Sequence, residues 1–305
     1  MSDSRVLTLA SEAYPARLRR LASPPRVLHL AGSWDHDGPI VALVGARDAT
    51  GDGLDFAQAL AAELAEANAA IVSGLALGID AAAHHGALRA GGLSGAVLGT
   101  SLDRCYPRDH ESLQEELRGS LGLMSELKPG TRSSKGAFAA RNRLVAAVAD
   151  VVVVVQGRET SGSLITARAA RRIGVPVGAV PWDPREPLGA GPNALIRDGR
   201  ATLIRDARDV LELAGVTRRR SIAPADRATR APSGATAHVP ARATPLPDAE
   251  ARAFAALRSR QQSLDEVAER AGLSVPAAGA ALMSLELAGL ARREPGGRYR
   301  RSRGS

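Results

Sequence analysis

The central part of the chain alternates between short β-branched runs and longer Ala- and Leu-rich stretches with apolar residues at helical spacing. Continuous apolar runs such as residues 151–155 indicate strands that are covered on both faces. The pattern predicts an α/β fold with a mostly parallel sheet and helices on both faces. The expected strands span residues 40–44, 70–73, 95–98, 122–125, 151–155, 177–180 and 201–203, and the expected helices lie near residues 53–67, 79–90, 111–119, 140–148, 163–173 and 193–198.

Beyond residue 247 the pattern changes to three short helices and a hairpin. A first helix is expected at residues 248–260, a second from Ser263 with a capping-box pattern, and a third from Ser274 to about residue 288. Residues 290–301, with a Pro-Gly-Gly turn in the middle, predict a β-hairpin. Three helices and a two-stranded wing are typical of a small winged-helix domain. Its third helix has no exposed Arg or Asn to contact a base edge, so DNA contact and protein contact stay equally open.

Composition divides the chain into four segments. Residues 1–38 are expected to be a short N-terminal arm, 39–215 an extended Rossmann-like domain, 216–247 a flexible basic linker, and 248–305 the winged-helix domain. Residues 1–215 contain 24 basic and 24 acidic residues, so the net charge of +8 comes from the rest of the chain. A local basic stretch nevertheless lies at residues 128–172, which contain nine basic residues and two acidic ones. This stretch is where a nucleic-acid site is expected.

Turns that are suited to anions follow three of the expected strands. They are Val-Gly-Ala-Arg at 44–47, Ser-Gly-Leu-Ala-Leu-Gly at 73–78, and Thr-Ser-Gly-Ser at 160–163, where amides at a helix start can hold an anion. Ligands of open α/β sheets bind at the carboxyl ends of the strands, so we expect the three turns to converge. Taken singly, each turn has a simpler interpretation as a tight turn or a helix N-cap. Arg141 and Arg143 open a further helix, and nearby Asp150 and Glu159 are too few to pair the whole basic stretch.

Several functional classes lack their sequence signature. No dinucleotide-binding G-x-G-x-x-G, P-loop or G-x-S-x-G motif is present, which argues against a catalytic site. His84 and His85 are interpreted mainly as packing residues, and Cys105 as a buried or incidental thiol. One cysteine and six histidines leave little for a metal site, and we expect no metal and no cofactor. The sequence has no apolar run of transmembrane length, which predicts a cytoplasmic protein without a membrane partner.

At these turns the sequence resembles the DprA/Smf family of bacterial DNA-processing proteins. The matching motifs occur in family order over nearly the whole of residues 14–215. The most specific are the long motif from Ser73 to His84 and the Phe-x-x-Arg-Asn-Arg element at 138–143. The other matching elements are Tyr14-Pro15, residues 24–28, 44–47, Leu102-Asp103 with Tyr106-Pro107, Ser125-Glu126 and residues 161–167.

The resemblance implies a non-catalytic protein that binds single-stranded DNA. Family members are thought to protect incoming strands and to load the RecA recombinase during natural transformation, as homodimers through the Rossmann domain. Carried over motif by motif, a first group of residues lines the DNA pocket, with Arg108 as a further phosphate contact, and a second group holds phosphates by hydroxyl and amide. The first group is Arg47, Lys135, Phe138, Arg141, Asn142 and Arg143, and the second is Ser73, Gly74, Ser161, Gly162, Ser163 and Thr166.

The sequence departs from the family pattern at a few positions. Ser101 stands where the family usually has glycine, Gln156 where it often has glutamate, Trp182 where a glycine follows the proline, and Ala139 where a proline is common. Two other functions stay open as alternatives. One is a phosphoribohydrolase-like enzyme that acts on nucleotide phosphates, although the Pro-Gly-Gly-x-Gly-Thr signature is absent. The other is a regulator whose winged helix binds duplex DNA.

Overall fold

The computed structural model describes residues 4–216, 248–258, 262–287, 290–294 and 298–302. The chain divides into two compact units, Met1–Ile222 and Ala223–Ser305. The expected linker at 216–247 lies outside the described residues, apart from its first residue. Among the described helices, none combines the length and the apolar character that a membrane span needs.

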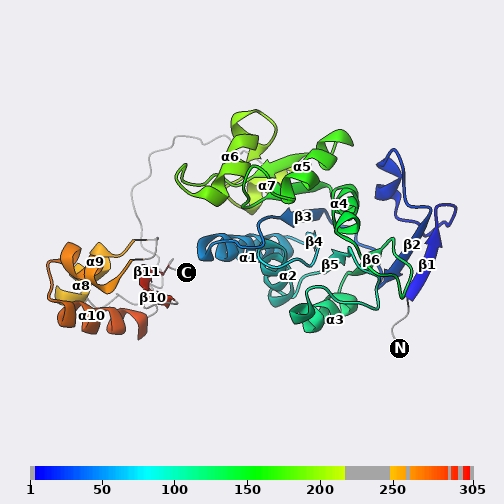
Figure 1. The fold of residues 1–305 in the computed structure, drawn as a ribbon. Coiled ribbons are helices and arrows are strands. Elements are labelled where there is room, and N and C mark those ends of the chain that lie inside the picture. The colour runs from blue at the N-terminus through cyan, green and yellow to red at the C-terminus, as the bar shows by residue number, and fades with distance from the viewer. Residues whose placement is uncertain (1–3, 217–247, 259–261, 288–289, 295–297, 303–305) are drawn as a thin grey trace, which may run out of the picture. The chain divides into compact units, whose positions relative to one another are not determined.

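A nine-stranded sheet forms the centre of the first unit (Figure 1). Its order is β1-β2-β6-β5-β4-β3-β7-β8-β9, with parallel pairing from β6 to β9 and antiparallel pairing on both sides of β2. Strands β3 to β6 are added one after another in one direction, and β7 then pairs on the other side of β3. The switch point of the sheet therefore lies between β3 and β7. The strands are β1 Ser4–Thr8, β2 Val27–Ala31, β3 Ile40–Val44, β4 Ala70–Ser73, β5 Ser94–Val97, β6 Gly122–Ser125, β7 Val151–Val154, β8 Val177–Ala179 and β9 Thr202–Leu203.

Two helical layers cover the faces of this sheet (Figure 1). Successive residues of a strand point to opposite faces, so Val41 and Leu43 pack with α1 and α2, whereas Ala42 and Val44 pack with α4 and α5. The helices are α1 Gly51–Glu66, α2 Ile79–Arg89, α3 Glu111–Gly119, α4 Lys135–Val148, α5 Ser163–Arg172, α6 Ala190–Arg197 and α7 Ala207–Leu213, with short 3-10 helices at Ala16–Arg20, Arg108–His110 and Pro187–Gly189.

The predicted fold class is confirmed, and three local differences stand out. The sequence predicted only an arm at residues 1–38, whereas β1 and β2 there extend the sheet beyond β6. Helix α4 begins at Lys135 rather than at residue 140, because the Ser134 side chain caps it by accepting a hydrogen bond from the Ala137 amide. Helix α7, capped in the same way by Asp206, was not expected.

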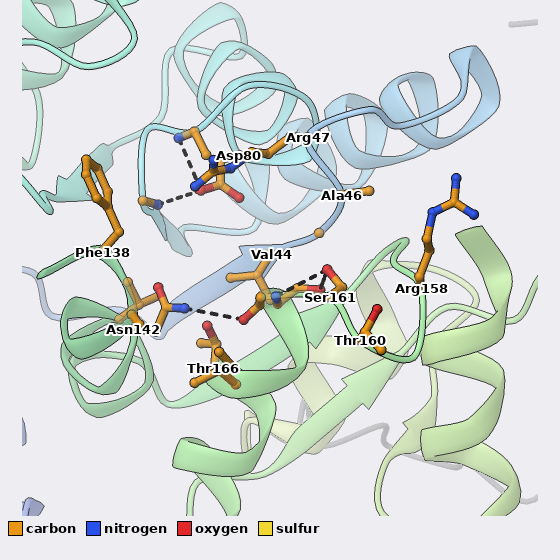
Figure 2. Close-up of a pocket in the computed structure, with 18 of the residues that line it drawn as sticks. Val44, Ala46, Arg47, Asp80, Phe138, Asn142, Arg158, Thr160, Ser161 and Thr166 are labelled. Carbon is orange, nitrogen blue, oxygen red and sulfur yellow. Dashed lines mark hydrogen bonds between the residues drawn. The ribbon is translucent and has the colours of Figure 1, made fainter. Parts of the chain in front are cut away.

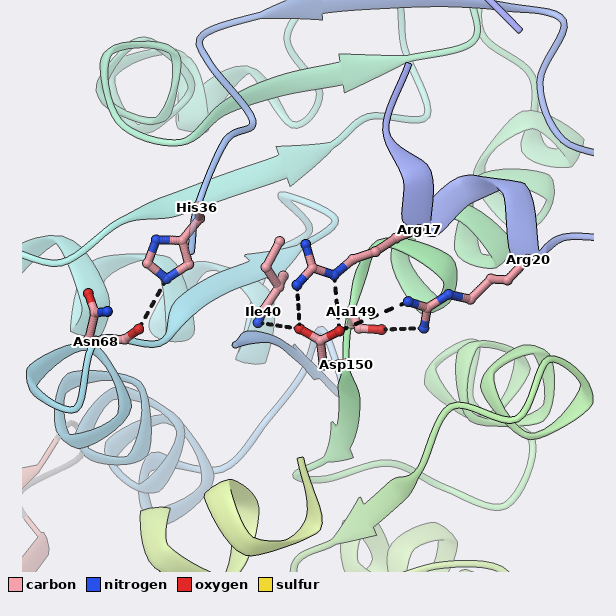
Figure 3. Close-up of polar contacts among 7 residues, drawn as sticks. All are labelled: Arg17, Arg20, His36, Ile40, Asn68, Ala149 and Asp150. Atoms are coloured by element: carbon pink, nitrogen blue, oxygen red, sulfur yellow. Dashed lines mark hydrogen bonds and ion pairs between the residues drawn. The ribbon is translucent and has the colours of Figure 1, made fainter. Parts of the chain in front are cut away.

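An ion-pair cluster at the amino edge of the sheet fixes the N-terminal segment (Figure 3). The Asp150 carboxylate accepts hydrogen bonds from Arg17 Nε at 3.0 Å, Arg17 Nη2 at 2.8 Å and the Ile40 amide at 2.9 Å. Arg20 donates to the Ala149 carbonyl at 3.2 Å. These contacts join the first 3-10 helix to the starts of β3 and β7.

The second unit has the predicted elements of a winged helix. Helices α8 Asp248–Ala256, α9 Leu264–Ala271 and α10 Val275–Leu287 are followed by the antiparallel pair β10 Ala291–Glu294 and β11 Arg298–Arg301. The expected capping box is present, because Ser263 accepts from the Glu266 amide while the Glu266 carboxylate accepts from the Ser263 amide. Val267, Leu282 and Leu285 are buried in the core of this unit. The turn expected at 295–297 lies outside the described residues.

Candidate functional site

A pocket of about 420 Å³ lies at the carboxyl edge of the sheet, at the switch point (Figure 2). The turns after β3, β4 and β7 meet there, as expected from the sequence, and α4 and α5 complete the walls. Of the residues singled out from the sequence, those that line this pocket are Arg47, Gly74, Phe138, Arg141, Asn142, Ser161, Gly162, Ser163 and Thr166.

Three other residues singled out from the sequence do not line this pocket, and the side chain of a fourth lies outside what the structure describes. Ser73 is fully buried, and its hydroxyl donates to the Leu43 carbonyl at 2.6 Å, which joins β4 to β3 instead of facing a ligand. Arg143 forms an ion pair with Glu126 at 2.5 Å. Arg108 is exposed in its 3-10 helix, outside the pocket. Lys135 begins α4, and its side chain lies outside what the structure describes.

Arg141 is buried against the turn after β4. Its guanidinium packs directly against Gly74, because a Cβ at position 74 would lie 2.0 Å from Arg141 Nη1. The same Nη1 donates to the Val97 carbonyl. Only 7% of Arg141 is exposed, and burial lowers the pKa of its guanidinium, which nevertheless stays charged because arginine pKa values are so high. The absence of a side chain at Gly74 therefore leaves the space that the Arg141 guanidinium occupies.

Asp80 provides the negative charge near Arg141. Its carboxylate accepts hydrogen bonds from the amides of Gly74 at 3.0 Å and Ala76 at 3.3 Å (Figure 2). Burial raises the pKa of Asp80 above its ordinary value, and the neighbouring Arg141 cation opposes that rise. Asp80 thus shapes the turn and balances a buried charge.

The opposite wall of the pocket consists of neutral polar groups at the start of α5. Asn142 Nδ2 donates to the Gly162 carbonyl at 3.3 Å, and the Ser161 and Ser163 hydroxyls lie 2.9 Å apart (Figure 2). Gly162 caps α5 without a side-chain hydrogen bond. The positive end of the helix dipole and these hydroxyls suit an anion.

An aromatic pair lies at one side of the pocket. The Phe138 ring lies with its centroid 5.3 Å from that of Tyr106, at an interplanar angle of 56°. Both rings line a small cavity beside the pocket, together with Arg47 and Leu77. Tyr106 is 55% exposed, and the sequence analysis did not assign it a role, although its Tyr-Pro motif was part of the resemblance. The side chains together offer an apolar face beside cationic groups.

The basic stretch at 128–172 is not a single patch. Arg143 is paired with Glu126, and Arg158 lies 3.8 Å from Asp48, two acids outside those that the sequence analysis counted. Asp150 is used at the other edge of the sheet by Arg17. The sequence therefore underestimated how many of these arginines have partners.

Two departures from the family pattern lie next to the pocket and do not line it. Gln156 is fully buried. Its Nε2 donates to Thr50 Oγ1 at 2.9 Å, and its Oε1 accepts from the Thr50 amide at 3.1 Å. Trp182 donates from its indole to the Val155 carbonyl at 2.6 Å and packs edge-on against Phe56. Both side chains stabilise the ends of strands that carry the pocket turns.

The residues interpreted as packing groups are placed accordingly. His84 is fully buried with Nδ1 2.8 Å from the Ser94 hydroxyl, and burial lowers its pKa to about 3, so it is neutral. The Cys105 thiol is half-buried and donates to the Pro107 carbonyl at 3.1 Å, and burial raises its pKa. Neither group lines the pocket.

Comparison with known proteins places this architecture in a family. The model of the DNA recombination-mediator protein A family matches residues 5–215, and that of the DprA winged helix domain matches residues 237–297. A putative DNA processing protein DprA from Mycobacterium tuberculosis is 38% identical over 281 residues, which cover 90% of this chain and 69% of that protein.

Two solved structures match about two thirds of this chain. DNA processing protein A from Streptococcus pneumoniae is 36% identical with a TM-score of 0.65, and the match covers 68% of this chain and 73% of that one. DNA processing protein A from Helicobacter pylori, whose single-stranded DNA binding mode has been described, is 32% identical with a TM-score of 0.61, over 68% of this chain and 94% of that one. With its Rossmann-like sheet and its C-terminal winged helix, the chain belongs to the DprA/Smf family of DNA-processing proteins.

Proposed function

We propose that this protein binds single-stranded DNA in the pocket at the carboxyl edge of the sheet, protects incoming strands and loads RecA recombinase on them during natural transformation. The observation that carries the proposal is the pairing, in one pocket, of an anion-binding wall at the start of α5 with the aromatic ring of Phe138. The single-stranded DNA binding of the Helicobacter pylori relative supports it.

The two walls suit the two parts of a nucleotide. Ser161, Ser163, Thr166 and the amides of the α5 start offer hydrogen bonds to phosphate oxygens, and the exposed Arg47 adds a positive charge. Phe138, next to Tyr106, offers a face on which a base can stack. A base in a duplex is already stacked and paired, so this arrangement favours a single strand. All thirteen site assignments made from the sequence stay predictions, including those of Ser73, Arg108, Lys135 and Arg143.

The pocket is assigned to binding rather than to turnover. Asp80, the one carboxylate buried in its lining among the described residues, is occupied by two backbone amides. The proposal also includes a homodimer through the Rossmann-like domain, which the family resemblance implies. Size-exclusion chromatography with light scattering measures this directly.

The test is fluorescence anisotropy of a labelled oligo-dT over a salt series, with the full chain. We expect single strands to bind more tightly than a duplex of equal length. For each phosphate contact, a tenfold rise in salt concentration should lower the association constant by roughly 0.7 logarithmic units. Phe138→Ala should weaken binding about 5- to 150-fold, because stacking contributes roughly 1–3 kcal/mol per base.

Tyr106 supplies a matched pair of variants. Tyr106→Ala should weaken binding because it removes a ring from the stacking face, whereas Tyr106→Phe should bind like the parent protein. Equal binding of duplex and single strand, or unchanged binding by Phe138→Ala, would contradict the proposed pocket. Assembly of RecA on strands covered by a single-strand-binding protein, with and without this chain, tests the loading step.

A further inference from the structure

A second cavity, of about 160 Å³, lies on the other side of helix α5. Ser163 and Thr166 line the first pocket, whereas Leu164, Arg168 and Arg171 line the second cavity. At 3.6 residues per turn these two sets lie on different faces of the helix. Helix α5 therefore separates two cavities that share its N-terminal end.

The second cavity carries an excess of arginine. It is lined by Arg168, Arg171, Arg197 and Arg200, against only Glu159 and Asp198. Asp198 is already shared, since Arg197 lies 2.9 Å and Arg200 3.4 Å from its carboxylate.

Arg168 and Arg171 are both exposed. Within the residues that the structure describes, neither makes an ion pair or a side-chain hydrogen bond. A ligand can bind these two cations without breaking an existing contact.

The segment between the two cavities is short and well held. Arg158, Thr160 and Ser161 line the first pocket (Figure 2), whereas Glu159 lines the second cavity. Helix α6 fixes this segment, because the Gly191 amide donates to the Gly157 carbonyl at 2.8 Å. A Cβ at position 191 would come within 2.5 Å of that oxygen, so a glycine is needed for this approach. The two cavities thus adjoin along one stable loop.

We propose that a single strand held in the first pocket continues across the start of α5 into the second cavity, where Arg168 and Arg171 bind the phosphates of the following nucleotides. This inference rests on the proposed function and adds a second phosphate-binding segment to it. Such contacts are independent of base sequence and add both affinity and salt dependence for strands long enough to reach them.

The test combines oligo-dT of increasing length with the variant Arg168→Ala/Arg171→Ala. Arg172→Ala is the matched control, because Arg172 is exposed on the same helix and lines neither cavity. We expect the double variant to bind the shortest oligonucleotides as the parent does. For long ones it should bind more weakly, with a salt slope smaller by about 1.4, or 0.7 for each lost phosphate contact. Arg172→Ala should follow the parent throughout.

Two outcomes would overturn the inference while the proposed function stands. One is unchanged binding of long oligonucleotides by the double variant while Phe138→Ala still loses affinity. The other is an equal loss in Arg172→Ala, which would assign the effect to general charge. If the parent protein binds neither short nor long strands, the proposed function itself is wrong. Binding of the shortest oligonucleotides tests the first pocket alone and so separates the two proposals.

Discussion

The two edges of the sheet each hold an arginine beside an aspartate, and they use them differently. At the amino edge Arg17 and Asp150 make two direct hydrogen bonds to each other, and the carboxylate also holds the Ile40 amide. At the carboxyl edge Asp80 accepts from the backbone while Arg141 donates to the Val97 carbonyl, so the two charges lie close without a direct ion pair.

The difference separates a structural contact from a prepared site. Arg17 and Asp150 hydrogen-bond directly to each other, so this pair serves to hold the N-terminal segment. Arg141 retains a buried Nε that has no hydrogen-bond partner within the described residues, in the wall of the pocket. A ligand that hydrogen-bonds to such a group gains binding free energy, because the protein has already removed the group from water.

The largest effect is expected for Arg141→Ala, which leaves the Asp80 carboxylate buried without its cation. The two groups make no direct ion pair, but a buried carboxylate left without its neighbouring cation should cost more unfolding free energy than the roughly 1–3 kcal/mol of a neutral buried polar group left unsatisfied. Denaturant unfolding measures this loss, and single-strand binding should fall with it. A variant as stable as the parent would show that Asp80 and Arg141 are not coupled.

The same variant has a pH signature. Burial raises the pKa of Asp80, so this group contributes most to stability below about pH 4, where it is protonated, and the contribution is lost as pH rises through the folded pKa. Without Arg141 that pKa rises further. The stability gap between Arg141→Ala and the parent should therefore widen as the pH rises through the folded pKa of Asp80 in the parent. Adding Asp80→Asn should remove the widening.

An intermediate effect is expected for Asp150→Ala at the opposite edge. The substitution removes the acceptor of three hydrogen bonds and leaves the Ile40 amide unsatisfied, at a cost of about 1–3 kcal/mol. Single-strand binding should be unchanged, because the site lies at the other edge. Asp183→Ala, which removes an exposed carboxylate paired with Arg185, is the control and should unfold like the parent. Lost DNA binding in Asp150→Ala would remove the contrast between the edges.

The smallest effect on stability is expected for Arg143→Ala. Its partner Glu126 lies in a part-exposed ion pair, with side-chain exposures of 34% and 28%, and such pairs contribute about 0–1 kcal/mol. The midpoints of thermal unfolding of Arg143→Ala, Arg141→Ala and the parent protein, measured side by side, test this difference. A loss as large as that of Arg141→Ala would show that the two neighbouring arginines do not differ as the structure indicates.

The sequence was sufficient for the sheet core and insufficient for its margin. Strands β3, β4 and β7 are apolar on both faces, so their runs are visible without an alignment. Strands β1 and β2 lie at the margin, where Val6 and Val27 are exposed and the apolar signal is diluted. The pairing of β2 with β6 joins residues that are distant in the sequence, which local patterns do not report.

The same limit applied to the pocket. Turn chemistry predicted that Arg47, Gly74 and Ser161 converge, because parallel strands end at one edge. It did not distinguish Arg141, which is buried, from Arg143, which is half-buried and paired with Glu126, since their partners come from other parts of the chain. Ser73 looked like its hydroxyl-bearing counterparts at 161 and 163, but a carbonyl of the adjacent strand occupies it.

The close approach of Gly74 and Arg141 also limits how the chain can change. A side chain at position 74 would displace the Arg141 guanidinium, whereas a shorter residue at 141 meets no such clash beside Gly74, so the constraint falls on position 74. In a library randomised at both positions and selected for folding, non-glycine residues at 74 should survive only together with short residues at 141. The residues tolerated at position 74 therefore depend on the residue at position 141, although the two lie in different elements of the fold.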